Sequence, residues 1–76
     1  MIPLIERLKL ILAEVLAIDS ETITDDATLE SIGADSLDLM DISCEILDQT
    51  GADVQESEMK LSMTVAKLAA MIESKL

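Results

Sequence analysis

Residues 33–47 read GADSLDLMDISCEIL, and this stretch decides how the chain folds. After a glycine turn and Ser36, apolar residues recur at the three- and four-residue spacing of an α-helix. The helix is predicted to begin at Asp35 or Ser36 and to end before Gly51, which suits a helix C-cap. A serine at such a position is most often only a cap. The free N–H groups of a helix start also favour a phosphate group, so this serine is a candidate for modification.

The rest of the chain predicts an all-α fold, a small bundle of three principal helices plus one short helix. Pro3 and a regular apolar face predict the first helix over residues 3–17. A short third helix is predicted over residues 57–61, and Thr64 is predicted to cap the last helix. The apolar faces of the first and last helices consist of Leu4, Leu8, Ile11, Leu12 and Val15, and of Val65, Leu68, Ala69, Ile72 and Leu76.

Residues 18–35 are rich in Asp, Ser and Thr and are predicted to form a long loop, with a short helical turn near residues 28–31. Unstructured connections longer than about 12–15 residues are uncommon in compact domains and tend to be functional. The apolar anchors of this loop are predicted to be Ile18, Ile23, Leu29 and Ile32.

The chain has 76 residues, so one domain over residues 1–76 is predicted. It has no Phe, Tyr or Trp, and its core is predicted to be aliphatic. One cysteine and no histidine exclude a disulfide within the chain and a zinc-type ligand cluster, and the cytoplasm is the expected compartment. Cys44 is predicted to act as a small core hydrophobe. Ser36 has no His or Lys nearby in the sequence to activate it as a nucleophile, so no enzyme is predicted.

The formal net charge of −11 is unevenly distributed. Residues 10–59 contain no Lys or Arg, yet they hold every acidic residue except Glu6 and Glu73. Such a field repels nucleic acid and anionic membranes and attracts proteins with basic patches. The leucine-rich N-terminus is interrupted by Glu14 and is too short for a membrane span, so it is predicted to be part of the fold.

The helix that begins near Ser36 is predicted to have an acidic stripe and two apolar groups. The stripe lies within an arc of roughly 80° at about 100° per residue. Like charges at these spacings destabilise a helix by roughly 0.2–0.5 kcal/mol per pair, so helix stability alone does not favour the stripe. The stripe is either a simple solvated face or a docking surface for a basic partner. The two apolar groups are predicted to pack on the first and last helices. The acidic stripe consists of Asp38, Asp41, Glu45 and Asp48, and the apolar groups are Leu37, Met40, Cys44 and Leu47, and Leu39, Ile42 and Ile46.

The motif GADSLDLMD resembles the attachment site of acyl carrier proteins, whose pattern is Gly-Ala/Gly-Asp-Ser-Leu followed by acidic residues on the same helix. The predicted order of helices also resembles that family. The resemblance implies that Ser36 receives 4′-phosphopantetheine from coenzyme A, with Asp35 and Leu37 as its motif neighbours. It also implies that acyl groups are carried as thioesters on the arm, and that the acidic stripe docks partner enzymes.

The partners that this resemblance implies are a phosphopantetheinyl transferase and acyl-loading and acyl-processing enzymes with basic patches, and a monomer is expected. An acyl chain attached through Ser36 is predicted to enter the interior of the bundle. The residues predicted to line its pocket are Leu39, Met40, Ile42, Cys44, Ile46, Leu47, Leu68 and Ile72.

The chain departs from the housekeeping fatty-acid carriers in the segment after this helix, LDQTGADVQESEM. The usual aromatic residue is missing, and Val54 stands about where an isoleucine is expected. The sequence is consistent with a fatty-acid carrier and equally with a specialised carrier of polyketide, modified lipid or amino-acyl groups. Peptidyl carriers prefer a Leu-Gly-Gly-His/Asp-Ser motif, which this chain lacks.

The alternative to a carrier is a calcium-responsive or other protein-binding module. Residues 19–30 have an acid at both ends of a 12-residue window, the length of an EF-hand loop. However, Thr24 occupies the sixth position, where a glycine is needed, and Ile23 occupies a ligand position. The interior of the window therefore disfavours calcium binding.

Overall fold

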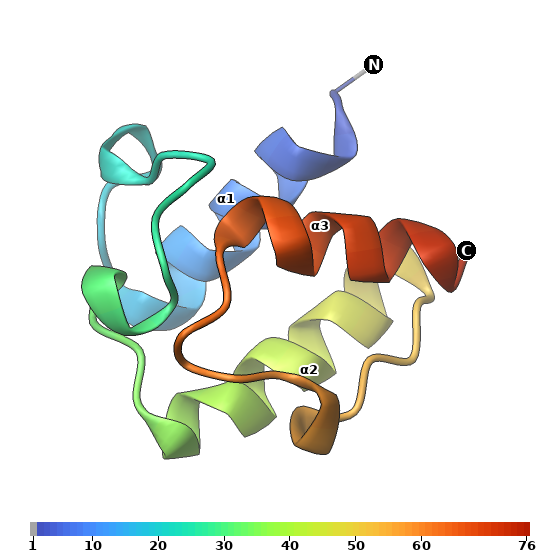
Figure 1. The fold of residues 1–76 in the computed structure, drawn as a ribbon. Helices are drawn as coiled ribbons and strands as arrows, with labels where there is room; N and C mark the ends of the chain where they lie inside the picture. The colour runs from blue at the N-terminus through green and yellow to red at the C-terminus, as the bar shows by residue number, and fades with distance from the viewer. Residues whose placement is uncertain (1) are drawn as a thin grey trace.

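The structure is a computed structural model, and it describes residues 2–76. No β-strand occurs within this range, and the predicted all-α bundle with three principal helices is confirmed (Figure 1). Single 3₁₀ turns, labelled η, lie in the connections. The elements in chain order are α1 (Leu4–Leu16), η1 (Ser20–Thr22), η2 (Glu30–Ile32), α2 (Ser36–Thr50), η3 (Glu56–Glu58) and α3 (Val65–Ser74).

The helix ends follow local signals in the sequence. Pro3 is the N-cap of α1, and Gly51 closes α2 with a φ of 83°, in the left-handed region that glycine adopts readily. Thr64 caps α3 as predicted, because its hydroxyl oxygen accepts a hydrogen bond from the Lys67 N–H at 3.1 Å. Two predictions were wrong in extent. The short third helix is a 3₁₀ turn at Glu56–Glu58, and α3 ends at Ser74, so Leu76 is exposed beyond the helix.

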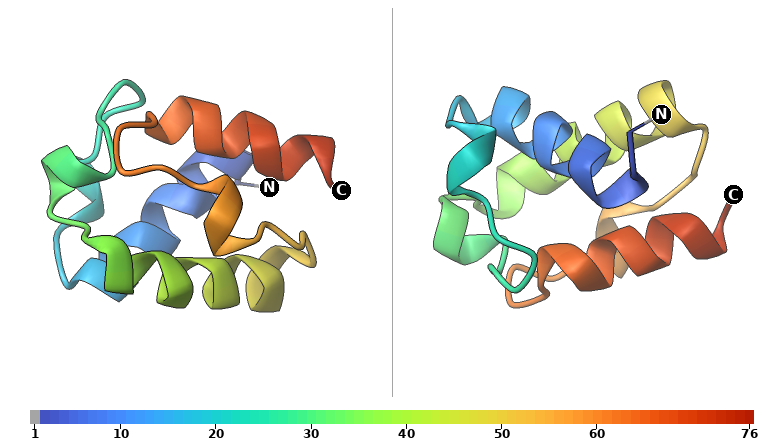
Figure 2. Two further views of the ribbon diagram at one scale, coloured as in Figure 1. Left: turned by 60° about the horizontal axis from the view of Figure 1, so that its bottom comes forward. Right: turned by 90° about the horizontal axis from the view of Figure 1, so that it is seen from above.

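The core lies where α1 meets the other two helices. α1 contacts both α2 and α3, and η3 packs on α2, between that helix and α3 in Figure 2. Buried aliphatic side chains fill the centre, and each contributes about 1.5–3 kcal/mol relative to remaining exposed. The core residues of the three helices include Leu8 and Leu12, Leu39, Ile42 and Ile46, and Val65, Leu68, Ala69 and Ile72.

Only one of the two apolar groups of α2 is buried, which corrects the prediction that both would pack. The group that contains Leu39, Ile42 and Ile46 faces the core, whereas the other group lies on the outer surface of the helix. Neighbouring elements pack on one side of α2, so the opposite side faces solvent. Cys44 belongs to the outer group and is exposed, so the prediction that it is a core residue was wrong. The outer group consists of Leu37, Met40, Cys44 and Leu47.

The connection between α1 and α2 is more ordered than the predicted loop. It contains η1, which was not predicted, and η2, which lies slightly later than the predicted turn. Its backbone pairs with the segment before α3, because the Leu29 N–H donates to the Met63 carbonyl at 3.1 Å and the Glu30 N–H donates to the Leu61 carbonyl at 2.9 Å. The predicted anchors Ile23 and Leu29 are buried. These contacts hold the chain in place just before α2 begins.

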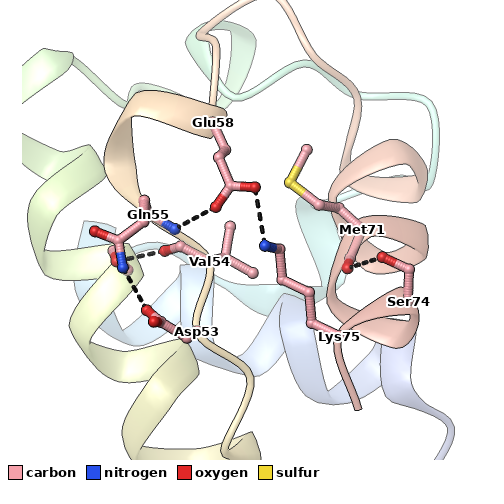
Figure 3. A network of polar contacts seen from close by, with 8 residues as sticks. Asp53, Val54, Gln55, Glu58, Met71, Ser74 and Lys75 are labelled. Carbon is pink, nitrogen blue, oxygen red and sulfur yellow. Dashed lines mark hydrogen bonds and ion pairs between the residues drawn. The ribbon is translucent and has the colours of Figure 1, made fainter.

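A polar network ties η3 to the end of α3 (Figure 3). The Lys75 ammonium lies 2.9 Å from one carboxylate oxygen of Glu58, and the Gln55 N–H donates to the other oxygen at 2.9 Å. Lys75, followed by the Gln55 N–H, lowers the pKa of Glu58 below its ordinary value. The network therefore contributes to stability while Glu58 is ionised, and this contribution is lost as the pH falls through the lowered pKa.

Candidate functional site

Ser36 is the first residue of α2, and its side chain is exposed. The capping role belongs to the preceding residue, Asp35. One oxygen of its carboxylate accepts hydrogen bonds from the Leu37 and Asp38 N–H groups at 3.0 Å each, and the Asp38 carboxylate accepts the Asp35 N–H at 2.9 Å. This reciprocal capping box explains the start of the helix without the serine. The Ser36 hydroxyl is therefore free to serve as a modification site.

The turn before Ser36 is held by the backbone of η2. Gly33 has a φ of 98°, a conformation that costs glycine little and other residues more. Its N–H donates to the Glu30 carbonyl at 3.1 Å, and the Ala34 N–H donates to the Leu29 carbonyl at 3.1 Å. Because Ala34 and Leu29 are buried, the turn that precedes Ser36 is fixed to the core.

The start of α2 offers little to a phosphate group that is not covalently bound. The Leu37 and Asp38 N–H groups are already bonded to Asp35, so the prediction that they are free was wrong. The carboxylates of Asp35 and Asp38 would also repel a second anion. A phosphopantetheine arm fits this site when it is bonded to the exposed Ser36 oxygen, since the covalent bond needs no anion-binding pocket.

The acidic stripe of α2 has no cationic partner within residues 2–76. Lys9 pairs with Glu6 at 3.2 Å and with Asp25 at 2.5 Å, and Lys75 pairs with Glu58. The hydrogen bond to Asp25, followed by the one to Glu6, raises the pKa of Lys9 above its ordinary value, so this ammonium stays charged. Both of its partners lie outside α2. The negative charge of the stripe is therefore available to a basic partner.

Salt should stabilise the protein because the acids of the stripe repel one another. Three like-charge pairs at helical spacing cost about 1 kcal/mol in total, and 1 kcal/mol corresponds to about 4–8 °C in Tm for a domain of this size. We expect the Tm to rise by several degrees when NaCl or MgCl₂ is added to a low-salt buffer. Thermal melts followed by helical circular dichroism measure this shift, and a Tm indifferent to both salts contradicts it.

An open cleft of about 280 Å³ separates the acidic side of α2 from α1. The cleft is lined by Glu14 and Val15 of α1 and by Asp41, Cys44 and Glu45 of α2. Glu14 thus adds a carboxylate to the same surface as the predicted stripe. The sequence contains no local signal for this, because Glu14 and Asp41 are brought together only by the packing of the two helices.

The predicted acyl-pocket residues divide into two sets. The core brings together one set, and the other set lies on the outer surface of α2. The buried set is Leu39, Ile42, Ile46, Leu68 and Ile72, and the exposed set is Met40, Cys44 and Leu47.

Three of the five acids at residues 19–30 have local structural roles that do not involve calcium. The Asp19 carboxylate accepts the Glu21 N–H at 2.9 Å and caps η1, and Asp25 pairs with Lys9. The Asp26 carboxylate accepts the Thr24 hydroxyl at 2.9 Å. No cluster of three or more potential metal ligands is found among residues 2–76. In the same range, no helix has the length and apolar character needed to cross a membrane.

Together these features describe a small helical domain with an exposed serine, not used as a cap, at the start of an acidic helix. Comparison with known proteins identifies its family. Residues 6–72 match the family described as "Phosphopantetheine attachment site". The chain is 34% identical to an acyl carrier protein of Thermotoga maritima, over 92% of this chain and 88% of that protein. It is 41% identical to an acyl carrier protein of Saccharopolyspora erythraea, over 79% of this chain and 64% of that protein.

The chain therefore belongs to the acyl carrier protein family. It is a carrier protein and not an enzyme. Members of this family carry a covalently attached 4′-phosphopantetheine group, and they interact with phosphopantetheinyl transferases and acyl-processing enzymes.

Proposed function

We propose that this chain carries acyl groups on a 4′-phosphopantetheine arm attached to Ser36. When bound, the arm supplies a terminal thiol on which acyl groups are held as thioesters. The observation that carries the proposal is the exposed Ser36 hydroxyl, which lies within the GADSL motif and has no capping role because Asp35 performs it. Asp35 and Leu37 are the motif neighbours that frame it.

Attachment replaces the hydroxyl proton of Ser36. The serine oxygen forms the new bond to the phosphorus that bears the arm, and the bond from that phosphorus to the bridging pyrophosphate oxygen of coenzyme A breaks. The nucleotide part leaves with the bridging oxygen, and the serine proton goes to a base. We assign the base that accepts this proton to the transferase, because no His or Lys of the chain stands near Ser36 in the sequence. Intact mass spectrometry of the protein after incubation with a phosphopantetheinyl transferase and coenzyme A tests the proposal. We expect the mass of one arm to be added, and an unchanged mass contradicts the proposal.

We further propose that residues 1–76 act as one monomeric carrier domain in the cytoplasm and serve fatty-acid, polyketide or related biosynthetic enzymes. The acidic stripe of α2 is their docking surface. The absence of a cationic partner for the stripe within residues 2–76 supports this role, because Asp38 in the capping box is the member of the stripe that helps to start the helix, and no ion pair holds the others. Enzymes with basic patches would be steered to the helix that presents Ser36.

Reversing one charge of the stripe should slow modification. Asp41 is exposed at the middle of α2, so we expect Asp41→Lys to lower the kcat/KM of the transferase about tenfold in low salt. The difference from wild type should shrink as NaCl is added, because surface charges are screened over about 8–10 Å. Glu21→Lys is the matched control, since Glu21 is exposed in η1 and gives the same change in net charge. Equal rates for both variants and wild type would mean that the stripe is only a solvated face.

We also propose that the core shelters the attached acyl chain among Leu39, Ile42, Ile46, Leu68 and Ile72, which are buried together. The exposed residues Met40, Cys44 and Leu47 are no longer part of this pocket. The core contains no aromatic ring, and aliphatic side chains can part to admit methylene groups. Each buried methylene returns roughly 0.8 kcal/mol.

NMR distinguishes a sheltered acyl chain from one that stays in solvent. When the bare arm is replaced by an octanoyl-loaded arm, the methyl signals of Ile46 and Ile72 should shift, and those of the exposed Leu47 should move little. Changes confined to residues around Ser36 would contradict sheltering.

A further inference from the structure

Residues 52–59, which we call the strap, close the core between α2 and α3. Both helices pack on α1, and no comparable packing joins α2 to α3 within residues 2–76. In its place, the strap inserts three buried side chains, Ala52, Val54 and Met59, into the cluster that also contains the core residues of both helices. In Figure 2, η3 of the strap lies between α2 and α3. The apolar interior is therefore closed on this side by a short segment with a single 3₁₀ turn.

The strap is fixed to α2 by contacts between neutral groups. The Ser43 hydroxyl donates to the Val54 carbonyl at 2.6 Å, and the Ala52 N–H donates to the Thr50 hydroxyl at 3.1 Å. Both hydrogen bonds are partly buried, and η3 also packs on α2. Salt screens interactions between charges and leaves such contacts in place. The α2 side is therefore the stable attachment of the strap.

The attachment of the strap to α3 is an ion pair. Among residues 2–76, the polar contact between the strap and the end of α3 is the Glu58–Lys75 pair of Figure 3. The Glu58 carboxylate also accepts the Gln55 N–H, so the same side chain holds η3 in shape. The side chains of Glu58 and Lys75 are 37% and 30% exposed, so salt and competing charges can reach them. In the same range, η3 has no packing on α3 comparable to its packing on α2. The α3 side of the strap therefore depends on one accessible electrostatic contact.

We propose that Glu58 and Lys75 form an electrostatic clasp, and that release of this clasp lets η3 move away from α3 while the three helices stay folded. The movement would uncover Val54 and Met59 and open the apolar interior between η3 and α3. An ion, or a charged group of a partner, that competes for Glu58 or Lys75 would then control access to the interior. The clasp needs no phosphopantetheine arm, so it is independent of the proposed function.

The clasp gives the protein two responses to salt with opposite signs. Salt stabilises the whole bundle, because it screens the repulsion among the acids of α2. Salt weakens the clasp, because it screens the attraction between Glu58 and Lys75. Opening of η3 is therefore a local event, separate from unfolding of the bundle.

Hydrogen exchange of the unmodified protein, followed by NMR, tests whether the opening is local. The Met59 N–H donates to the Glu56 carbonyl at 3.1 Å within η3, so its exchange reports opening of the strap. The N–H of Leu12, which is fully buried in α1, reports unfolding of the bundle. Urea below the unfolding transition should accelerate the exchange of Leu12 and leave that of Met59 nearly unchanged, because a local opening exposes little surface. Equal responses of the two amides to urea would overturn the proposal.

Two charge-neutralising variants in η3 test whether the ion pair holds the strap. Glu58 and Glu56 are both exposed, and no ion pair is found for Glu56 within residues 2–76. We expect Glu58→Gln to lower the protection factor of the Met59 N–H about threefold in low salt, and the difference from wild type to shrink as NaCl is added. Glu56→Gln is the matched control and should stay within about 1.5-fold of wild type. Equal protection in the two variants would mean that the pair does not hold η3.

A double-mutant cycle tests the other half of the clasp. Lys75→Gln should lower the protection factor of the Met59 N–H about as much as Glu58→Gln does. The double variant should lower it no further than either single variant, because all three lack the same contact. Losses that add in the double variant would show that the two residues act independently, which contradicts the clasp.

Discussion

Replacing Ser36 with alanine should abolish attachment of the phosphopantetheine arm. The Ser36 oxygen is the atom that forms the bond to phosphorus, and alanine offers no substitute for it. Because Asp35 caps α2 and Ser36 is exposed, the alanine variant should keep its fold and its Tm. Intact mass after incubation with transferase and coenzyme A should show a complete loss of modification, with the helical circular dichroism spectrum unchanged.

Ser31→Ala is the matched control for this variant. Ser31 is also exposed and lies in η2, five residues before Ser36, and its hydroxyl donates to the Thr28 carbonyl at 2.7 Å. This variant should be modified at the wild-type rate. Addition of an arm to Ser36→Ala, or loss of modification in Ser31→Ala, would place the attachment site elsewhere.

Truncating Ile46 should cause the largest loss of stability among the changes considered. Ile46 is fully buried in the core, and an isoleucine-to-alanine change at such a position costs about 2–5 kcal/mol. A small domain has little stability in reserve, so Ile46→Ala should lower the Tm by about 10 °C or more, or unfold the protein. Urea denaturation followed by circular dichroism measures the free energy of unfolding.

The neighbouring residue Leu47 provides the control on the same helix. It is half exposed, so Leu47→Ala should change the free energy of unfolding by less than about 1 kcal/mol. Similar losses for Ile46→Ala and Leu47→Ala would mean that both apolar groups of α2 are packed, contrary to the structure.

The helices and their ends could be predicted because their signals are local. Pro3, Gly51 and Thr64 lie at helix ends where their backbone or side-chain chemistry is needed, and the apolar residues between them recur with helical spacing. The capping box of Asp35 and Asp38 also has a local signal, because Asp35 is a residue type that caps helices and Asp38 places a carboxylate three residues later, where Glu or Gln is usual.

The burial of α2 could not be predicted, because it depends on how many neighbours surround the helix. The sequence shows two apolar groups, but only the packing of α1 and η3 on one side decides that Ile42 is buried and Met40 is exposed. Glu14 lies beside Asp41 because α1 packs on α2, and the Leu29 N–H donates to the Met63 carbonyl, which is far away in the sequence. Neither contact can be predicted from a local sequence pattern.

The most direct test of the carrier function is to load the protein with octanoyl-coenzyme A and the transferase, and then to treat it with neutral hydroxylamine. We predict that the intact mass rises by one acyl-bearing arm and that hydroxylamine removes only the acyl group, because a thioester is cleaved and the phosphodiester is not. Fragmentation should then locate the remaining arm on Ser36. No gain in mass, or an acyl group found directly on the exposed Cys44 with no arm on Ser36, would contradict the account.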